Sequence, residues 1–121
     1  MSHTILAVDD SPSMRRMVAH VLTSSGYAVL EAADGEEALH LALANRVDAV
    51  LTDQNMPKMD GIALVKRLRT LDGYERTPIM LLTTESSAEM KQKGRAAGAT
   101  GWMVKPFDPD RLLEMFARIL K

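Results

Sequence analysis

Hydrophobic residues along the chain follow two alternating patterns. Short runs rich in apolar and β-branched residues alternate with longer segments in which apolar residues recur every three or four positions. The first pattern is typical of buried strands and the second of amphipathic helices. Five such pairs follow one another, and the predicted strands are Thr4 to Val8, Ala28 to Glu31, Ala49 to Thr52, Ile79 to Thr83 and Gly101 to Val104.

Capping signals mark the starts of the predicted helices. Ser11 comes before a proline suited to a first helical turn, and Gly26 ends the segment. Asp34 can cap the second helix, with Glu37 three positions later as its capping-box partner. The other helices are predicted to begin at Asp60, at Ser86 or Ser87, and at Asp108. The first helix is expected to bury one apolar stripe, made of Met14, Met17, Val18, Val21 and Leu22.

Strands that alternate with helices predict an α/β fold with a parallel sheet. We expect a flavodoxin-like doubly wound (βα)5 arrangement with strand order 2-1-3-4-5, formed by residues 1–121 as a single domain with no effector domain. In this order the first and third strands are neighbours at the switch point. Ligands of such folds bind beyond the carboxyl ends of these strands.

Composition narrows the functional classes. The 121 residues are 46% hydrophobic and carry a formal net charge of -1, with no block of like charge that would indicate binding to nucleic acid or to a membrane. No run of residues reaches membrane-spanning length, and the start lacks the pattern of a signal peptide. The absence of cysteine excludes thiolate chemistry and suits a reducing compartment. We therefore expect a cytoplasmic protein.

Residues suited to phosphoryl chemistry follow three of the predicted strands. Asp9 and Asp10 follow the first strand, Asp53 follows the third and Lys105 follows the fifth. If the carboxyl ends of these strands meet, three carboxylates and an ammonium group share one crevice. Two carboxylates about 5 Å apart repel by about 3 kcal/mol at an effective dielectric constant near 20. A hard cation such as Mg²⁺ suits this set, with Lys105 offsetting part of the charge.

Asp53 is the candidate nucleophile, because a carboxylate can attack phosphorus to form an acyl phosphate while cations neutralise the transferring oxygens. Thr83 ends the fourth strand, and its hydroxyl could bond a phosphoryl oxygen on Asp53. Pro106 follows Lys105, and a cis bond there would help to fix where the ammonium group points.

Taken together, these residues resemble the receiver domain of two-component response regulators, and within it the small stand-alone CheY-type chemotaxis regulators. The resemblance covers essentially the whole chain. Its motifs are the acidic pair Asp9-Asp10, the segment from Asp53 to Gly61, Thr83, and Gly98-Ala99 leading to Lys105-Pro106-Phe107. Each motif is a weak signal alone, but their order and spacing are specific.

The resemblance implies that Asp53 accepts a phosphoryl group from a histidine kinase of the CheA type. It also implies that Mg²⁺ is held by Asp10, Asp53 and the backbone carbonyl of Asn55, with Asp9 supporting through water. Thr83 would then move toward the phosphoryl group and Trp102, at the position of the family's switch aromatic, would turn inward. Thr84 is larger than the residues that the family favours there, which predicts slower access for a phosphodonor.

The output implied by the resemblance is non-covalent binding through the fourth helix, fifth strand and fifth helix, for example to a flagellar motor switch component. We expect a monomer that catalyses only its own phosphorylation and dephosphorylation, and the sequence leaves open whether a phosphatase assists. A stand-alone receiver in another phosphorelay is the main alternative.

Two other functions fit the sequence less well. An FMN-binding flavodoxin-like protein needs a phosphate-cradling loop after the first strand, where Asp9 and Asp10 would repel a phosphate. An aspartyl-phosphate phosphatase usually carries an acid two residues after its nucleophile, and this chain has Asn55 there.

Overall fold

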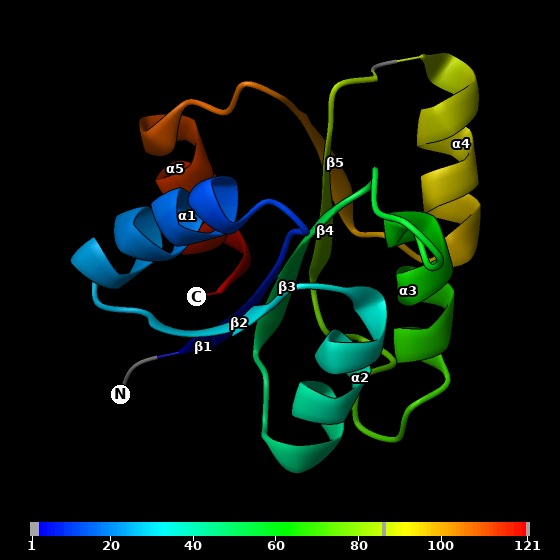
Figure 1. Ribbon diagram of the computed structural model, residues 1–121, viewed down its shortest axis with the longest axis horizontal. Coiled ribbons are helices and arrows are strands. Elements are labelled where there is room, and N and C mark those ends of the chain that lie inside the picture. The colour runs from blue at the N-terminus through cyan, green and yellow to red at the C-terminus, as the bar shows by residue number, and fades with distance from the viewer. Residues whose placement is uncertain (1–2, 86, 121) are drawn as a thin grey trace.

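A computed structural model describes residues 3–85 and 87–120, in which five strands alternate with five helices (Figure 1). The strands are β1 (Thr4–Val8), β2 (Ala28–Ala32), β3 (Ala49–Asp53), β4 (Ile79–Thr83) and β5 (Gly101–Val104). The helices are α1 (Pro12–Ser24), α2 (Gly35–Ala44), α3 (Gly61–Arg69), α4 (Ala88–Ala97) and α5 (Pro109–Ile119). The predicted elements are confirmed, and only β2 and β3 extend one residue further than predicted.

The strands form one parallel sheet in the order β2-β1-β3-β4-β5, as predicted. Side chains alternate between the two faces of each strand, which divides the core into two layers. Leu6 and Val8 of β1 pack with α2, α3 and α4, whereas Ile5 and Ala7 pack with α1 and α5. Figure 1 shows the same division, with α1 and α5 on one side of the sheet and the other three helices on the opposite side.

The predicted caps start the helices as expected. Ser11, Asp34, Asp60, Ser87 and Asp108 each accept a hydrogen bond from a backbone N–H of the helix that they precede. Ser86, the other candidate for α4, lies outside the described residues.

The box at the start of α2 differs in one detail from the pattern of a capping box. Asp34 accepts from the N–H of Glu37 at 2.8 Å, but the Glu37 carboxylate accepts from the N–H of Ala33 rather than from that of Asp34. The glutamate therefore bonds the backbone one residue before the N-cap, whereas the standard box bonds the N-cap residue itself.

The prediction that Met17 faces the core is wrong, since 54% of this residue is exposed. The buried face of α1 is formed by Val18, Ala19 and Leu22. Successive residues are offset by about 100° around a helix, so Met17 and Ala19 lie on opposite sides of Val18. Met17 therefore falls outside the buried face. Met14 and Val21 lie at the margin of the face and are partly buried.

Among the helices within the described ranges, none combines the length and apolar character needed to cross a membrane.

Candidate functional site

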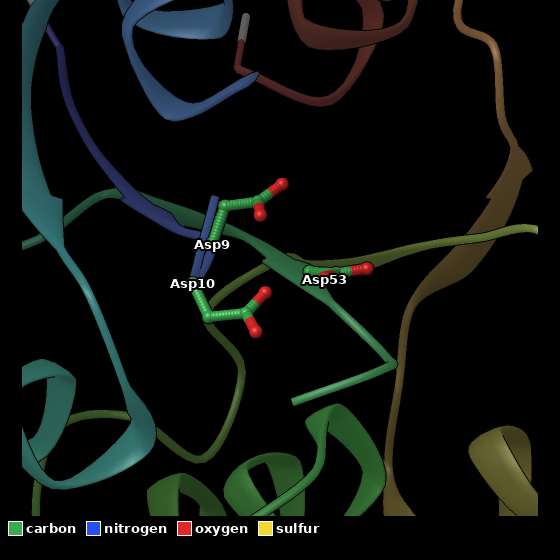
Figure 2. A group of neighbouring side chains, drawn as sticks. All are labelled: Asp9, Asp10 and Asp53. Carbon is green, nitrogen blue, oxygen red and sulfur yellow. The ribbon is translucent and has the colours of Figure 1, made fainter. Parts of the chain in front are cut away.

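The carboxyl ends of β1 and β3 bring three aspartates together. The parallel register pairs Val8 with Thr52, so the residues that come next, Asp9 just after β1 and Asp53 at the end of β3, also lie side by side. Asp10 follows at the start of the turn into α1, and Figure 2 shows the three carboxylates at this edge of the sheet. Each contributes an oxygen atom, and these three oxygens lie within 4.8 Å of one another.

This arrangement places three carboxylates close together, two of them buried from solvent. Asp9 and Asp53 are buried, with 4% and 3% of their surfaces exposed, whereas Asp10 is exposed. At a separation of 4.8 Å, two carboxylates repel by about 3.5 kcal/mol at an effective dielectric constant near 20. Burial raises the pKa of the Asp9 carboxyl above its usual value of 3.8, and the nearby charge of Asp53 adds to the rise.

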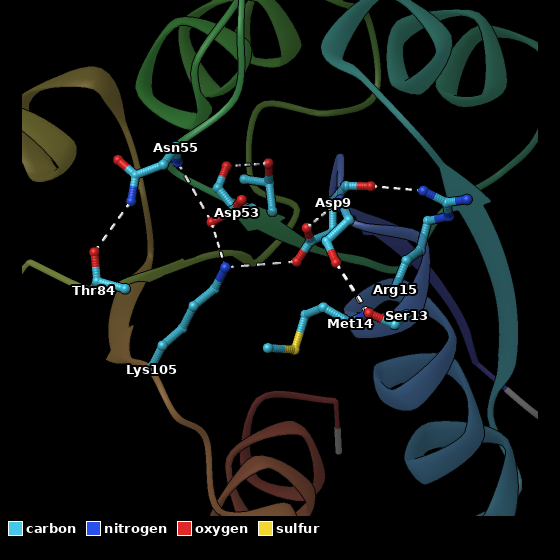
Figure 3. Close-up of polar contacts among 10 residues, drawn as sticks. Asp9, Ser13, Met14, Arg15, Asp53, Asn55, Thr84 and Lys105 are labelled. Atoms are coloured by element: carbon cyan, nitrogen blue, oxygen red, sulfur yellow. Dashed lines mark hydrogen bonds and ion pairs between the residues drawn. The ribbon is translucent and has the colours of Figure 1, made fainter.

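Lys105 supplies the positive charge of the cluster (Figure 3). Its Nζ atom lies 2.9 Å from Oδ1 of Asp53 and 3.7 Å from Oδ2 of Asp9, and its side chain is largely buried. The backbone N–H of Lys105 donates to the carbonyl of Thr83 at 2.7 Å, which joins the loop after β5 to the end of β4. The peptide between Lys105 and Pro106 is cis, the isomer considered from the sequence.

Arg15 supports the acidic turn and was not singled out from the sequence. Its Nη1 atom donates to the backbone carbonyl of Asp9 at 2.8 Å, and its Nε atom pairs with Glu31 at 3.3 Å. The N–H of Ser11 also donates to Oδ1 of Asp9 at 2.9 Å. Asp9 is thus held through its carboxylate and its main chain, which limits how far it can move from Asp53.

Asn55 lies beside the candidate nucleophile. Its N–H donates to Oδ1 of Asp53 at 3.4 Å, and its side-chain amide donates to the Thr84 hydroxyl at 3.4 Å (Figure 3). The second bond joins the loop after β3 to the loop after β4, next to Asp53. Replacing Thr84 by alanine would therefore remove this hydrogen bond as well as reduce the volume of the side chain.

Thr83 and Trp102 both bond to the backbone of Glu85. Thr83 is fully buried, and its hydroxyl accepts from the N–H of Glu85 at 3.1 Å. The indole N–H of Trp102 donates to the carbonyl of Glu85 at 3.1 Å. A single peptide segment thus connects the end of β4 with the aromatic side chain of β5.

The side chain of Trp102 fits beside α4 because residue 94 is glycine. A Cβ atom on Gly94 would lie 3.1 Å from the indole ring and 2.9 Å from Leu81. The ring is partly buried against the core layer that α2, α3 and α4 share.

The donor set fits Mg²⁺ better than it fits a softer metal. Three carboxylates provide only oxygen ligands, and the mutual repulsion of buried acids is relieved by a divalent cation. Lys105 alone cannot neutralise three negative charges. The cluster therefore has the charge and the donor atoms that suit a hard cation, and it places the Asp53 carboxylate next to the positive charge of Lys105.

Comparison with known proteins identifies the family of the chain. A family model described as "Response regulator receiver domain" matches residues 5–117. The chain is 42% identical over 118 residues to a chemotaxis protein CheY homolog of Campylobacter jejuni, an alignment that covers 96% of this chain and 91% of the relative. The transcriptional regulatory protein SrrA of Staphylococcus aureus is 34% identical over 121 residues, covering all of this chain and 49% of SrrA.

A solved structure extends the likeness to three dimensions. The chemotaxis protein CheY4 of Vibrio cholerae superimposes with a TM-score of 0.96 at 51% identity, covering 98% of this chain and 99% of CheY4. The family model spans nearly the whole sequence, the alignments cover 91% of the Campylobacter homolog and 99% of CheY4, and CheY4 has the same fold. The chain therefore belongs to the response regulator receiver domain family, among relatives of the CheY type.

Proposed function

We propose that this protein is a phosphorylation switch of a two-component system and that Asp53 is its phosphoacceptor. The observation that carries the proposal is the contact of 2.9 Å between Nζ of Lys105 and Asp53, within a cluster of three carboxylates. A salt bridge that served stability alone would not need two further acids beside it.

Asp9, Asp10, Asp53 and the backbone carbonyl of Asn55 are the residues that would hold Mg²⁺. When bound, the ion supplies positive charge beside the oxygens of the transferring phosphoryl group. Asp53 belongs to the metal site and also provides the nucleophile. The N–H of Asn55 donates at 3.4 Å to Oδ1 of Asp53, the same oxygen that Lys105 contacts, so the two groups together hold this oxygen (Figure 3).

The proposed transfer forms one bond and breaks one. An oxygen of the Asp53 carboxylate attacks the phosphorus of a phosphohistidine on the kinase. The new O–P bond forms as the P–N bond breaks, and the electron pair of the broken bond remains on the imidazole nitrogen. Lys105 stabilises the negative charge of the phosphoryl oxygens during this step. Later attack by water breaks the O–P bond, which releases inorganic phosphate and restores the carboxylate.

The switch would act through the peptide of Glu85. If the Thr83 hydroxyl turns to bond a phosphoryl oxygen, the Glu85 N–H loses its present acceptor. The loop that carries the Glu85 carbonyl can then move, which changes the partner of the Trp102 indole. Phosphorylation would thereby shift the population of conformations on the face formed by α4, β5 and α5.

Chemotaxis is the process that we propose for this switch, with a CheA-like histidine kinase as donor and a flagellar motor switch component as target. The Campylobacter and Vibrio relatives are both described as chemotaxis proteins, which supports this assignment. A different phosphorelay is the second candidate, because the same domain makes up about half of a transcriptional regulator, SrrA. Binding to flagellar switch peptides that requires phosphorylation would favour the first candidate.

Fluorescence of Trp102 tests the switch, because this is the only tryptophan in the chain. We expect the emission to change when both Mg²⁺ and either acetyl phosphate or beryllofluoride are present. Neither Mg²⁺ alone nor an Asp53→Asn variant under the same conditions should give this change. An equal change in Asp53→Asn would contradict the assignment of the phosphoacceptor.

A further inference from the structure

Gln54 is a buried polar residue between Asp53 and Asn55. Only 4% of its surface is exposed, yet both ends of its side-chain amide are bonded. Its Oε1 atom accepts from the N–H of Ile62 at 2.8 Å, and its Nε2 atom donates to Oδ2 of Asp60 at 3.2 Å. The side chain therefore links the end of β3 to the start of α3, across the loop that contains Asn55.

The main chain of Gln54 makes the same connection. Its carbonyl accepts from the N–H of Met56 at 3.2 Å and from that of Gly61 at 3.1 Å. A Cβ atom on Gly61 would lie 2.6 Å from the carbonyl oxygen of Asp53 and 2.9 Å from Cα of Gln54. Only glycine permits this approach, so the first residue of α3 lies directly against the backbone of the candidate phosphoacceptor.

Asp60 joins this link to the helix cap. Its Oδ1 atom accepts from the N–H of Ala63 at 2.8 Å, while its Oδ2 atom accepts from Gln54. Two of the free N–H groups at the start of α3 are thus satisfied, one by Asp60 and one by Gln54. Removing the Gln54 amide would take these partners from the Ile62 N–H, which is partly buried, and from Oδ2 of the exposed Asp60.

We propose that Gln54 is a positioning residue for the metal site, which fixes the loop between β3 and α3 so that the Asn55 carbonyl can serve as a ligand beside Asp53. This inference rests on the proposed function, which assigns that carbonyl to Mg²⁺. Gln54 touches neither the metal nor the phosphoryl group. It acts by tying the loop to a helix end that packs against Asp53.

The chain offers a reciprocal exchange that tests this role. Gln54→Leu removes both hydrogen bonds at similar volume, and Gln54→Glu places a second carboxylate against Asp60. Asp60→Asn combined with Gln54→Glu restores one donor and one acceptor, because an asparagine amide can donate to the new carboxylate while its oxygen still caps α3. The double variant also keeps the net charge of the protein.

Mg²⁺ binding should be measured by NMR titration of the Asp53 and Asn55 amides in the full chain. We expect the dissociation constant to rise by about tenfold or more in Gln54→Leu and in Gln54→Glu, the usual effect of losing an outer-shell partner. The Gln54→Glu/Asp60→Asn protein should return to within about threefold of the original value. Hydrogen exchange of the Ile62 amide without metal should accelerate in Gln54→Leu and recover in the double variant.

Leu68→Ala is the matched control, since it destabilises α3 at the end away from the site. It should lower thermal stability without changing the dissociation constant for Mg²⁺. Normal Mg²⁺ affinity in Gln54→Leu, or equal weakening in Leu68→Ala, would overturn the role of Gln54 alone. A wild-type protein whose Asp53 and Asn55 amides do not respond to Mg²⁺ would overturn the proposed function and this inference with it.

Discussion

Replacing Asp9 by asparagine should stabilise the metal-free protein, although it removes an ion pair. Asp9 lies 3.7 Å from Lys105, an attraction of about 4.5 kcal/mol at an effective dielectric constant near 20. Repulsion from Asp53, with oxygens within 4.8 Å, is at least about 3.5 kcal/mol on the same scale, and Asp10 adds a smaller, more screened contribution.

These Coulomb terms nearly cancel for Asp9, so the burial of its charge decides the sign. Asparagine keeps the acceptor for the Ser11 N–H and carries no charge. We therefore expect Asp9→Asn to raise the free energy of unfolding by about 1 to 2 kcal/mol at pH 7 without metal.

The pH dependence of this difference follows from the pKa of Asp9. Burial raises that pKa in the folded protein above the usual value of 3.8. The folded state then binds the proton more tightly than the unfolded state. The resulting stabilisation is fully present below pH 3.8 and is lost as the pH rises through the folded-state pKa. The advantage of Asp9→Asn should therefore be largest at pH 7 and should shrink as the pH falls toward 4.

Urea unfolding in EDTA at pH 7 and pH 4.5 measures both effects. Added Mg²⁺ should stabilise the wild type by about 2.7 kcal/mol at one hundred times its dissociation constant, and should stabilise Asp9→Asn less. A variant that is less stable than the wild type in EDTA at pH 7 would refute the reasoning, because it would mean that attraction to Lys105 outweighs burial and repulsion.

Three further changes test other parts of the structure. Lys58 has a left-handed φ of 68°, a conformation that asparagine adopts more readily than lysine. Lys58→Asn should therefore stabilise the protein by about 0.5 to 1 kcal/mol in urea unfolding. A loss of stability would show that no strain is relieved. Thr84→Ala removes the hydrogen bond from Asn55 and should speed phosphorylation by acetyl phosphate by about two- to fivefold. An unchanged rate would contradict the prediction that Thr84 slows access of the phosphodonor. Arg69 donates four hydrogen bonds of 2.7 to 3.0 Å to backbone carbonyls, two of them to Gly98, so Arg69→Ala should cost about 2 to 3 kcal/mol and Arg69→Lys less. Equal losses in these two variants would contradict the role of the planar guanidinium.

The strand ends could be predicted from the sequence because their placement depends on a general property of parallel sheets. Once Asp9, Asp53 and Lys105 are assigned to the ends of β1, β3 and β5, the topology places them at one edge. The helix caps are equally local, because a capping side chain bonds to a backbone N–H two or three residues away.

The supporting contacts could not be predicted, since they depend on how separate elements pack. Gln54 reaches Asp60 and Ile62 only because α3 folds back against the end of β3. Arg15 meets Glu31 only because β2 lies beside β1. A glutamine after the aspartate or an arginine in the first helix has many alternative roles, and neither spacing identifies the partner.

Covalent modification of Asp53 is the final test. The protein should be treated with acetyl phosphate and Mg²⁺, reduced with borohydride to trap an acyl phosphate, and mapped by mass spectrometry. We expect a single reduced residue at position 53, dependent on Mg²⁺ and absent from Asp53→Asn. A label on Asp9 or Asp10, or no acyl phosphate on Asp53 at saturating donor and metal, would contradict a phosphoacceptor placed between Lys105 and the acidic pair.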